Sequence, residues 1–240
     1  PWKKLREAGF RFAIIKFFHG PWRGDAETRA CAERQYKGAK DEGFLVGPYG
    51  WWEKSGSPSI LDERIHAWTK EMPLDDDLPL MIDCEEKSLP QSVQTRLDGE
   101  YLFRKYRERT GRDAICYSGS WWADLWMPGS SELLREIPYA HAAYPSIHAS
   151  GTDYEGALKE WLAMEQPELP ILWRGKRPLM WQADGDRGLV LPLEDNAPKG
   201  TPHVDVDVDL ADWDDLCALV PALRNLAVQE PFDWRKPAPA

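Results

Sequence analysis

The chain has 240 residues, of which 42% are hydrophobic and 29% charged, and its formal net charge is −10. These values indicate one soluble globular domain and argue against a nucleic-acid partner, because binding nucleic acid requires clustered Lys and Arg to neutralise phosphates. The chain contains neither a run of 18 apolar residues nor a charged segment followed by an apolar one, so we expect no membrane span and see no signal peptide.

We expect a single domain over residues 1–230, followed by a Pro-rich tail over residues 231–240. The four cysteines are widely spaced and form no Cys-x-x-Cys pair, so we expect no metal site and no cofactor. Cys84 and Cys116 lie inside apolar runs, where a buried thiol acts as a small hydrophobic side chain.

The first half of the chain alternates between helical patterns and short apolar strands. We predict a helix at 3–8, a strand at 12–16, a helix from a cap at Asp25 to residue 42, and a strand at 44–49. A capping box of Ser59 with Asp62 would open the next helix. A second capping box, Ser88 with Gln91, would open a helix that runs to about residue 109.

The second half continues the same pattern with fewer helices. We predict strands at 114–117, 139–144, 179–182 and 203–209, and helices at 154–164 and 210–227. With the strand around residues 80–84, seven strands alternate with helices or loops, which predicts a parallel sheet. Closure into a barrel takes eight strands, and the missing one would have to precede Pro1.

The segment at residues 80–86 is the strongest candidate for chemistry. An apolar run that ends in acid is typical of a buried strand that delivers carboxylates to its exposed end. Side chains alternate along a strand, so Asp83 and Glu85 would share one face, about 6.6 Å apart along the backbone. Two crowded carboxyls can divide into a proton donor and an ionised partner, as glycoside hydrolysis requires. Alternatively, they cap a helix or pair with basic residues.

The segment at residues 203–209 alternates strictly between Val and polar residues. Asp205, Asp207 and Asp209 would lie on one strand face with His203, while the valines occupy the other. Several charges facing a barrel axis would be costly unless some are paired, protonated or at the open end. A calcium site is the alternative interpretation, although its ligands usually come from a tight loop.

Thirteen tryptophans are many for this length. Two adjacent pairs, Trp51 with Trp52 and Trp121 with Trp122, follow predicted strands at the end where loops build barrel active sites. Flat aromatic faces can cover sugar rings, and an indole N–H can bind a hydroxyl. Ordinary packing under loops explains each pair equally well.

With these segments placed, the chain resembles the family 25 glycoside hydrolases, the muramidase-type lysozymes that cut peptidoglycan. The resemblance covers nearly the whole chain. It rests on the strand at 12–16, Gly47-Pro48-Tyr49, Asp83-Cys84-Glu85, Tyr117-Ser118-Gly119 with Trp122, Trp181-Gln182 and Val208-Asp209-Leu210. It implies an α/β fold, an irregular TIM-like (β/α) barrel with eight strands and about five helices, of which this chain starts after the first strand.

The resemblance also implies roles for individual residues. Glu85 would be the general acid and base, with Asp83 assisting an intermediate formed by the substrate's own N-acetyl group. Asp209 would be the third catalytic residue, with Asp207 as the alternative because a two-residue register error keeps the face. Substrate binding is expected from Tyr49, Trp51, Tyr117, Trp122, Trp181, Gln182 and Asp207, with the tyrosines donating to an acetamido group.

The leading hypothesis is therefore an enzyme that hydrolyses β-1,4 bonds of peptidoglycan or a related N-acetylated glycan, as a monomer that is secreted or delivered to the cell wall. Three departures from the family pattern motivate an alternative: His19 in place of an acid, Tyr49-Gly50-Trp51 in place of Tyr-His-Phe, and the absent first strand. The alternative is a non-catalytic glycan-binding protein on the same scaffold. A chitinase-like site would need a longer Asp-x-x-Asp-x-Asp-x-Glu run, which Met81 interrupts.

Overall fold

The fold was analysed in a computed structural model of the chain. It describes residues 2–7, 12–17, 26–53, 57–71, 78–143, 168–176, 178–184 and 206–209. The helices predicted at 154–164 and 210–227, the cap at Asp25, and His19 lie outside the described residues. So do the side chains of Trp181, Asp207 and Asp209, although their backbones are described.

In the part of the chain that the structure describes, seven strands form one curled sheet in which neighbours in sequence are neighbours in space. They are β1 (Phe12–Lys16), β2 (Leu45–Trp51), β3 (Met81–Asp83), β4 (Ile115–Ser118), β5 (Tyr139–Ala142), β6 (Met180–Asp184) and β7 (Val206–Asp209). All the strands predicted from the sequence are present, with ends that shift by a few residues. From β1 to β5 each pair of successive strands is connected through at least one helix, as is usual for neighbouring parallel strands.

Strands β1 to β6 run parallel, whereas β7 runs antiparallel to β6. The expectation of a wholly parallel sheet is therefore wrong for the last pair. The alternation at residues 203–209 correctly marks a strand, but a period of two carries no information about direction, which the connection decides. In the described residues the sheet is a curled, mainly parallel one with an antiparallel edge.

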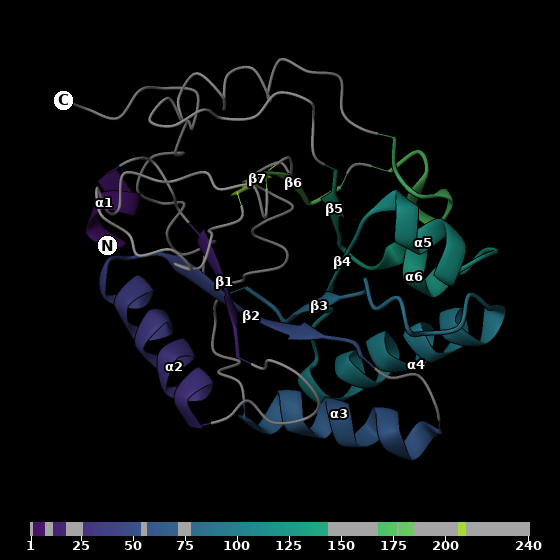
Figure 1. Cartoon of the computed structure of the whole chain (residues 1–240), viewed down its shortest axis with the longest axis horizontal. Helices are drawn as coiled ribbons and strands as arrows, with labels where there is room; N and C mark the ends of the chain where they lie inside the picture. Colours follow the sequence, from purple (N-terminus) through teal and green to yellow (C-terminus); the bar gives the residue numbers. More distant parts are fainter. Residues whose placement is uncertain are drawn as a thin grey trace.

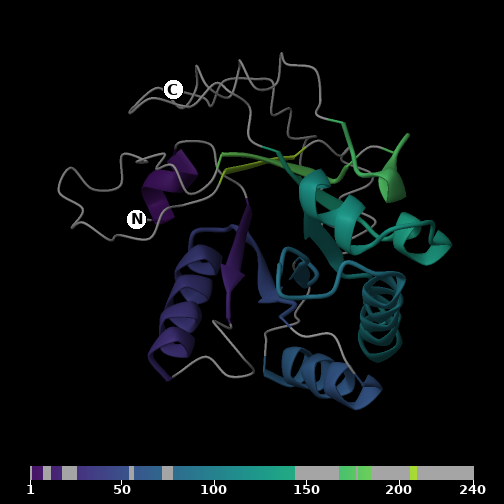
Figure 2. The same cartoon turned by 45° about the vertical axis from the view of Figure 1, so that its right-hand side comes forward.

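The helices pack along one side of this sheet. They are α1 (Trp2–Glu7), α2 (Ala26–Asp41), α3 (Pro58–Glu71), α4 (Val93–Thr110), α5 (Ser120–Trp126) and α6 (Glu132–Glu136), with a short 3₁₀ turn η1 (Ile171–Trp173). Figure 1 and Figure 2 show α2, α3 and α4 following one another around the outside of the sheet, with α5 and α6 continuing the series. None of the described helices is long and apolar enough to cross a membrane.

Two predicted helix starts are wrong. Helix α3 begins at Pro58, which suits a first helical position because it has no N–H to satisfy, so Ser59 lies inside the helix. Helix α4 is capped by Ser92, whose hydroxyl accepts the Thr95 N–H at 3.3 Å, in place of Ser88. The predicted end of α4 is confirmed, because Gly111 adopts a left-handed conformation (φ 70°) that closes the helix.

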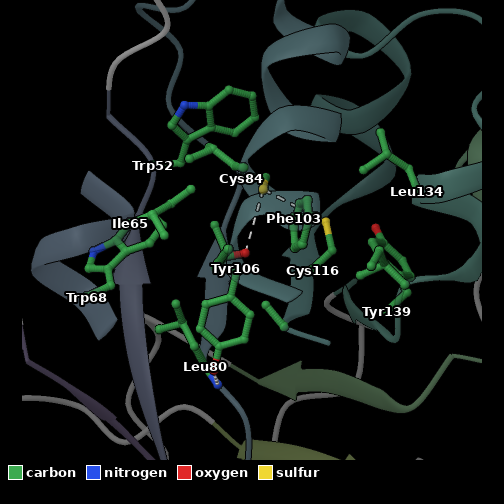
Figure 3. Close-up of a cluster of buried hydrophobic side chains, with 14 of the residues drawn as sticks. Trp52, Ile65, Trp68, Leu80, Cys84, Phe103, Tyr106, Cys116, Leu134 and Tyr139 are labelled. Atoms are coloured by element: carbon green, nitrogen blue, oxygen red, sulfur yellow. Dashed lines mark hydrogen bonds between the residues drawn. The ribbon is translucent and has the colours of Figure 1, made fainter. Parts of the chain in front are cut away.

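The core is divided by the sheet into two clusters. The larger cluster lies between the sheet and the helices, and Figure 3 shows Leu80 and Cys84 of the β3 segment packed against Phe103 and Tyr106 of α4. The smaller cluster lies on the opposite side, here called the inner face, and includes Met81, Ile115, Tyr117 and Met180. Alternation along each strand therefore sends one set of side chains to the helices and the other to the inner face.

Candidate active site

The candidate site is built around Asp83, the last residue of β3. Register places Asp83 between Trp51 of β2 and Tyr117 of β4. Its side chain is 4% exposed, and the Tyr49 hydroxyl donates a hydrogen bond to its Oδ2. The carbonyl of Asp83 accepts the Trp52 N–H at 3.0 Å. Backbone and side chain are both held from β2, so the position of this carboxylate is fixed before any ligand arrives.

Glu85 lies just beyond the end of β3 and is only partly buried. The Gly119 N–H, at the end of β4, donates to Glu85 Oε1 at 3.2 Å. The ladder between the two segments extends past the strand, because the Cys84 N–H donates to the Tyr117 carbonyl at 2.8 Å. The two predicted acids thus lie at the carboxyl ends of neighbouring parallel strands, where active sites of α/β folds form.

Cys84, between the two acids, points the other way. It is fully buried in the cluster against the helices, with its Sγ 3.8 Å from Sγ of Cys116 (Figure 3). Burial raises the pKa of the Cys84 thiol well above its ordinary value, so it stays protonated. The interpretation of Cys84 and Cys116 as small hydrophobic side chains is confirmed by this packing.

The inner face carries a second polar contact. The Tyr117 hydroxyl donates to Oε1 of Gln182, and the Gln182 side chain is buried. Gln182 pairs in register with Asp207 of β7, and Met180 pairs with Asp209. The sheet therefore brings both candidate aspartates of β7 beside the strand that carries Gln182, while the choice between them stays a prediction.

Lys16 lies beside the candidate site, and the sequence analysis did not single it out. Its ammonium lies 5.2 Å from the centre of the Tyr49 ring and 5.1 Å from that of Trp51. Register pairs Lys16, the last residue of β1, with Tyr49, two residues before the end of β2. The sequence could have predicted this position: side chains alternate along the strand, so Lys16 shares a face with Phe12 and Ile14, and these two residues contact the inner cluster.

The comparisons with known proteins identify the family of this chain. The family model "Glycosyl hydrolases family 25" matches residues 1–163. The chain belongs to this family. It is accordingly a glycosidase, and the resemblance described from the sequence is confirmed. A search of curated proteins found no match.

Several solved structures share the fold of this family 25 chain. A muramidase from Trichobolus zukalii is 21% identical, with 92% of each chain covered and a TM-score of 0.62. A bacterial lysozyme from Streptomyces coelicolor is 18% identical, with 92% of this chain and 91% of the lysozyme covered and a TM-score of 0.64. A family 25 lysozyme from Aspergillus fumigatus is 18% identical, with 91% of each chain covered and a TM-score of 0.62.

In each of the two tryptophan pairs of this glycosidase, one side chain is fully buried and the other is not. Trp52 and Trp122 are fully buried, with ring centres 6.1 Å apart, and the Trp122 indole N–H donates to the Glu86 carbonyl at 3.0 Å. Trp122, which was expected to bind substrate, is therefore placed in the core against the helices. Trp51 lies on the inner face beside Lys16, and Trp121 is exposed.

Within the described residues, no group of three or more His, Cys, Asp or Glu side chains is arranged to hold a metal ion. The calcium interpretation of residues 203–209 falls on side chains outside the description. The donors to Asp83 and Glu85 include a tyrosine hydroxyl and a backbone N–H. These groups orient carboxyls for proton transfer and charge stabilisation.

Proposed function

We propose that this chain is an N-acetylmuramidase, a lysozyme that hydrolyses β-1,4 bonds of peptidoglycan or a related N-acetylated glycan, with Glu85 as general acid and base and Asp83 assisting. The observation that carries the proposal is the placement of these two carboxyls at the ends of adjacent strands in a family 25 chain, each oriented by its own donor. The names of the solved relatives support the choice of substrate.

The two acids have surroundings that suit different tasks. Glu85 is partly exposed and accepts an N–H at one oxygen, and a carboxyl held in this way can carry a proton on the other oxygen for the leaving group. Asp83 is buried and receives the Tyr49 hydroxyl, an arrangement that fixes an ionised carboxylate. In the proposed mechanism Asp83 stabilises the intermediate that the substrate's N-acetyl group forms, and Glu85 then activates water.

The remaining predicted residues have supporting roles in this proposal. Tyr49 and Tyr117 lie at strand ends on the inner face, where their hydroxyls could pass hydrogen bonds to an acetamido group. Gln182 positions Tyr117, and Trp51 offers an aromatic wall. Asp209, with Asp207 as the alternative, completes the acidic set from β7, and Trp181 of β6 binds substrate.

The curled sheet is proposed to form the larger part of an irregular eight-stranded (β/α) barrel. The sequential strand order and the likeness to solved family 25 structures support this closure. We also propose that the protein acts as a monomer outside the membrane, where its substrate lies.

The decisive experiment compares Glu85→Gln with Glu86→Gln. Reducing ends released from a peptidoglycan suspension should disappear in Glu85→Gln, while Glu86→Gln, a matched change one residue away, should keep most of the activity. Circular dichroism checks that both variants fold. Full activity in Glu85→Gln would remove Glu85 from the mechanism. An inactive parent chain that still binds the glycan would favour a non-catalytic glycan-binding protein.

A further inference from the structure

One glycine connects Glu85 to an exposed tryptophan. Gly119 donates its N–H to Glu85 Oε1 at 3.2 Å. A Cβ added at Gly119 would lie 2.3 Å from Nε1 of Trp121, so the edge of the indole packs directly on the Gly119 backbone. The same Cβ would lie 3.0 Å from the Ala142 carbonyl oxygen at the end of β5. Gly119 thus contacts both residues, and Trp121 lies at the same end of the sheet as the proposed acid.

Trp121 differs from the other tryptophans around it. Trp122 and Trp126 are buried and stacked on each other, whereas the Trp121 side chain is 46% exposed. A single exposed aromatic residue is ordinary on a protein surface. Two observations nevertheless make Trp121 a candidate for ligand binding: it packs on Gly119, which binds Glu85, and it lies beside a positively charged side chain.

The second feature is a cation. The Lys87 ammonium lies 4.8 Å from the centre of the Trp121 ring. Lys87 is exposed and follows Glu85 by two residues, so it arrives from the end of β3, whereas Trp121 arrives from the end of β4. An apolar ring and a positive charge thus converge from two adjacent strands at the edge of the proposed site.

This pairing matches one kind of ligand. An indole face covers the apolar face of a sugar ring, and an ammonium group pairs with a carboxylate. The chain as a whole carries a charge of −10, which would repel an anionic polymer, so a local cation beside the site gives an anionic sugar a place to bind. A neutral glycan would use the ring but gain nothing from Lys87.

We propose that Trp121 and Lys87 form an accessory subsite that binds a carboxylate-bearing N-acetylated sugar unit of the strand being cut. The inference rests on the proposed hydrolase function for its substrate, and it adds two specificity residues to that site. Trp121 packs on the sugar ring, and Lys87 selects strands with a carboxylate over neutral ones. Neither residue takes part in bond cleavage.

The test uses the full chain and two ligands, soluble peptidoglycan fragments and neutral N-acetylglucosamine oligomers. Binding by calorimetry and kcat and KM from reducing-end release are measured for Trp121→Ala and Lys87→Gln. The controls are Leu125→Ala, which removes an exposed apolar side chain one turn further along α5, and Lys70→Gln, which removes an exposed lysine from α3.

Trp121→Ala should weaken binding and raise KM about 10-fold for both ligands, at the upper end of what aromatic stacking contributes. Lys87→Gln should raise KM about 2- to 5-fold for peptidoglycan only, and less at high salt, as for an exposed ion pair. kcat should stay within about two-fold of the parent in both. The two controls should match the parent throughout.

The outcomes separate this inference from the proposed function. An active parent whose KM is unchanged in Trp121→Ala would overturn the subsite and leave the hydrolase intact. An equal loss for both ligands in Lys87→Gln would overturn the carboxylate selectivity. If the parent is inactive, binding decides: weaker binding in Trp121→Ala supports the subsite, and binding equal to the parent refutes it.

Discussion

Acid should destabilise this protein through His141. His141 lies on β5, is 1% exposed, and packs against Tyr139, whose hydroxyl is 3.3 Å from its Nδ1. Burial lowers the pKa of His141 from its ordinary 6.5 to about 4, against a smaller opposing effect of a backbone hydrogen bond with Ser118. The folded protein therefore keeps this imidazole neutral in a range where the unfolded chain protonates it.

The direction follows from proton binding. Between pH 6.5 and about 4 the unfolded state binds more protons than the folded state, so the free energy of unfolding falls as the pH falls. Each tenfold difference in proton affinity is worth about 1.4 kcal/mol, which sets an upper bound of about 3.4 kcal/mol for His141. About 2 kcal/mol of this should be lost by pH 5, and almost none at pH 7.

Urea unfolding followed by tryptophan fluorescence at pH 7 and pH 5 measures this loss. His141→Gln lowers stability at both pH values, because it disturbs a packed site, but its stability should fall by about 2 kcal/mol less than that of the parent between them. His66→Gln, which removes an exposed histidine from α3, is the matched control. Equal pH dependence in the parent and His141→Gln would refute the reasoning, as would an NMR titration of His141 near pH 6.5.

Two further predictions concern the site. Tyr49→Phe removes the hydroxyl bound to Asp83 and should lower kcat roughly 10- to 100-fold, as for a hydrogen bond to a charged group. The control, Tyr101→Phe, removes a 3.0 Å hydrogen bond to Asp62 on the helical side and should leave kcat unchanged. Equal effects of the two substitutions would show that Tyr49 has no role in the site. Gly119→Ala should displace Trp121, lower activity and cost about 1–3 kcal/mol of stability. The control, Gly99→Ala, should be tolerated, because its Cβ would lie 3.4 Å from the nearest atom, in the Trp52 ring, which is an ordinary van der Waals distance. Unchanged activity in Gly119→Ala would contradict the packing described for Trp121.

The position of Asp83 at the end of a strand could be predicted because the pattern that marks a buried strand is local in the sequence. An apolar run ending in Asp83 places a carboxyl at the end of a buried strand whatever surrounds it, and the structure has β3 ending at that residue. Trp51 was expected to follow a strand at 44–49 and to bind substrate; it lies instead within β2, where the period of two places it on the same face as Asp83, and its binding role stays a prediction. The same expectation failed for Trp122, because residues 120–126 form helix α5, whose period of 3.6 turns Trp122 to the core and Trp121 to solvent.

What the sequence could not provide is the contacts between strands. The bond from Tyr49 to Asp83 joins residues 34 positions apart, as does that from Gly119 to Glu85. Each depends on how far β2 and β4 extend relative to β3, and no propensity encodes that register. The predicted starts of α3 and α4 were wrong because several Ser residues precede or open each helix, and the local pattern does not single out the one at which the helix begins.

The difference between the two carboxyls arises from the point at which β3 stops. Asp83 is still in the ladder, so β2 and β4 flank it and bury it, while Glu85 has left the ladder and accepts the Gly119 N–H at the end of β4. A register slip of one residue would exchange the faces and send Cys84 to the inner side and Asp83 into the apolar cluster against the helices. The cost of burying that charge makes the slipped pairing unfavourable. The packing that places Leu80, Ile82 and Cys84 in the core therefore also aims the acids at the opposite face.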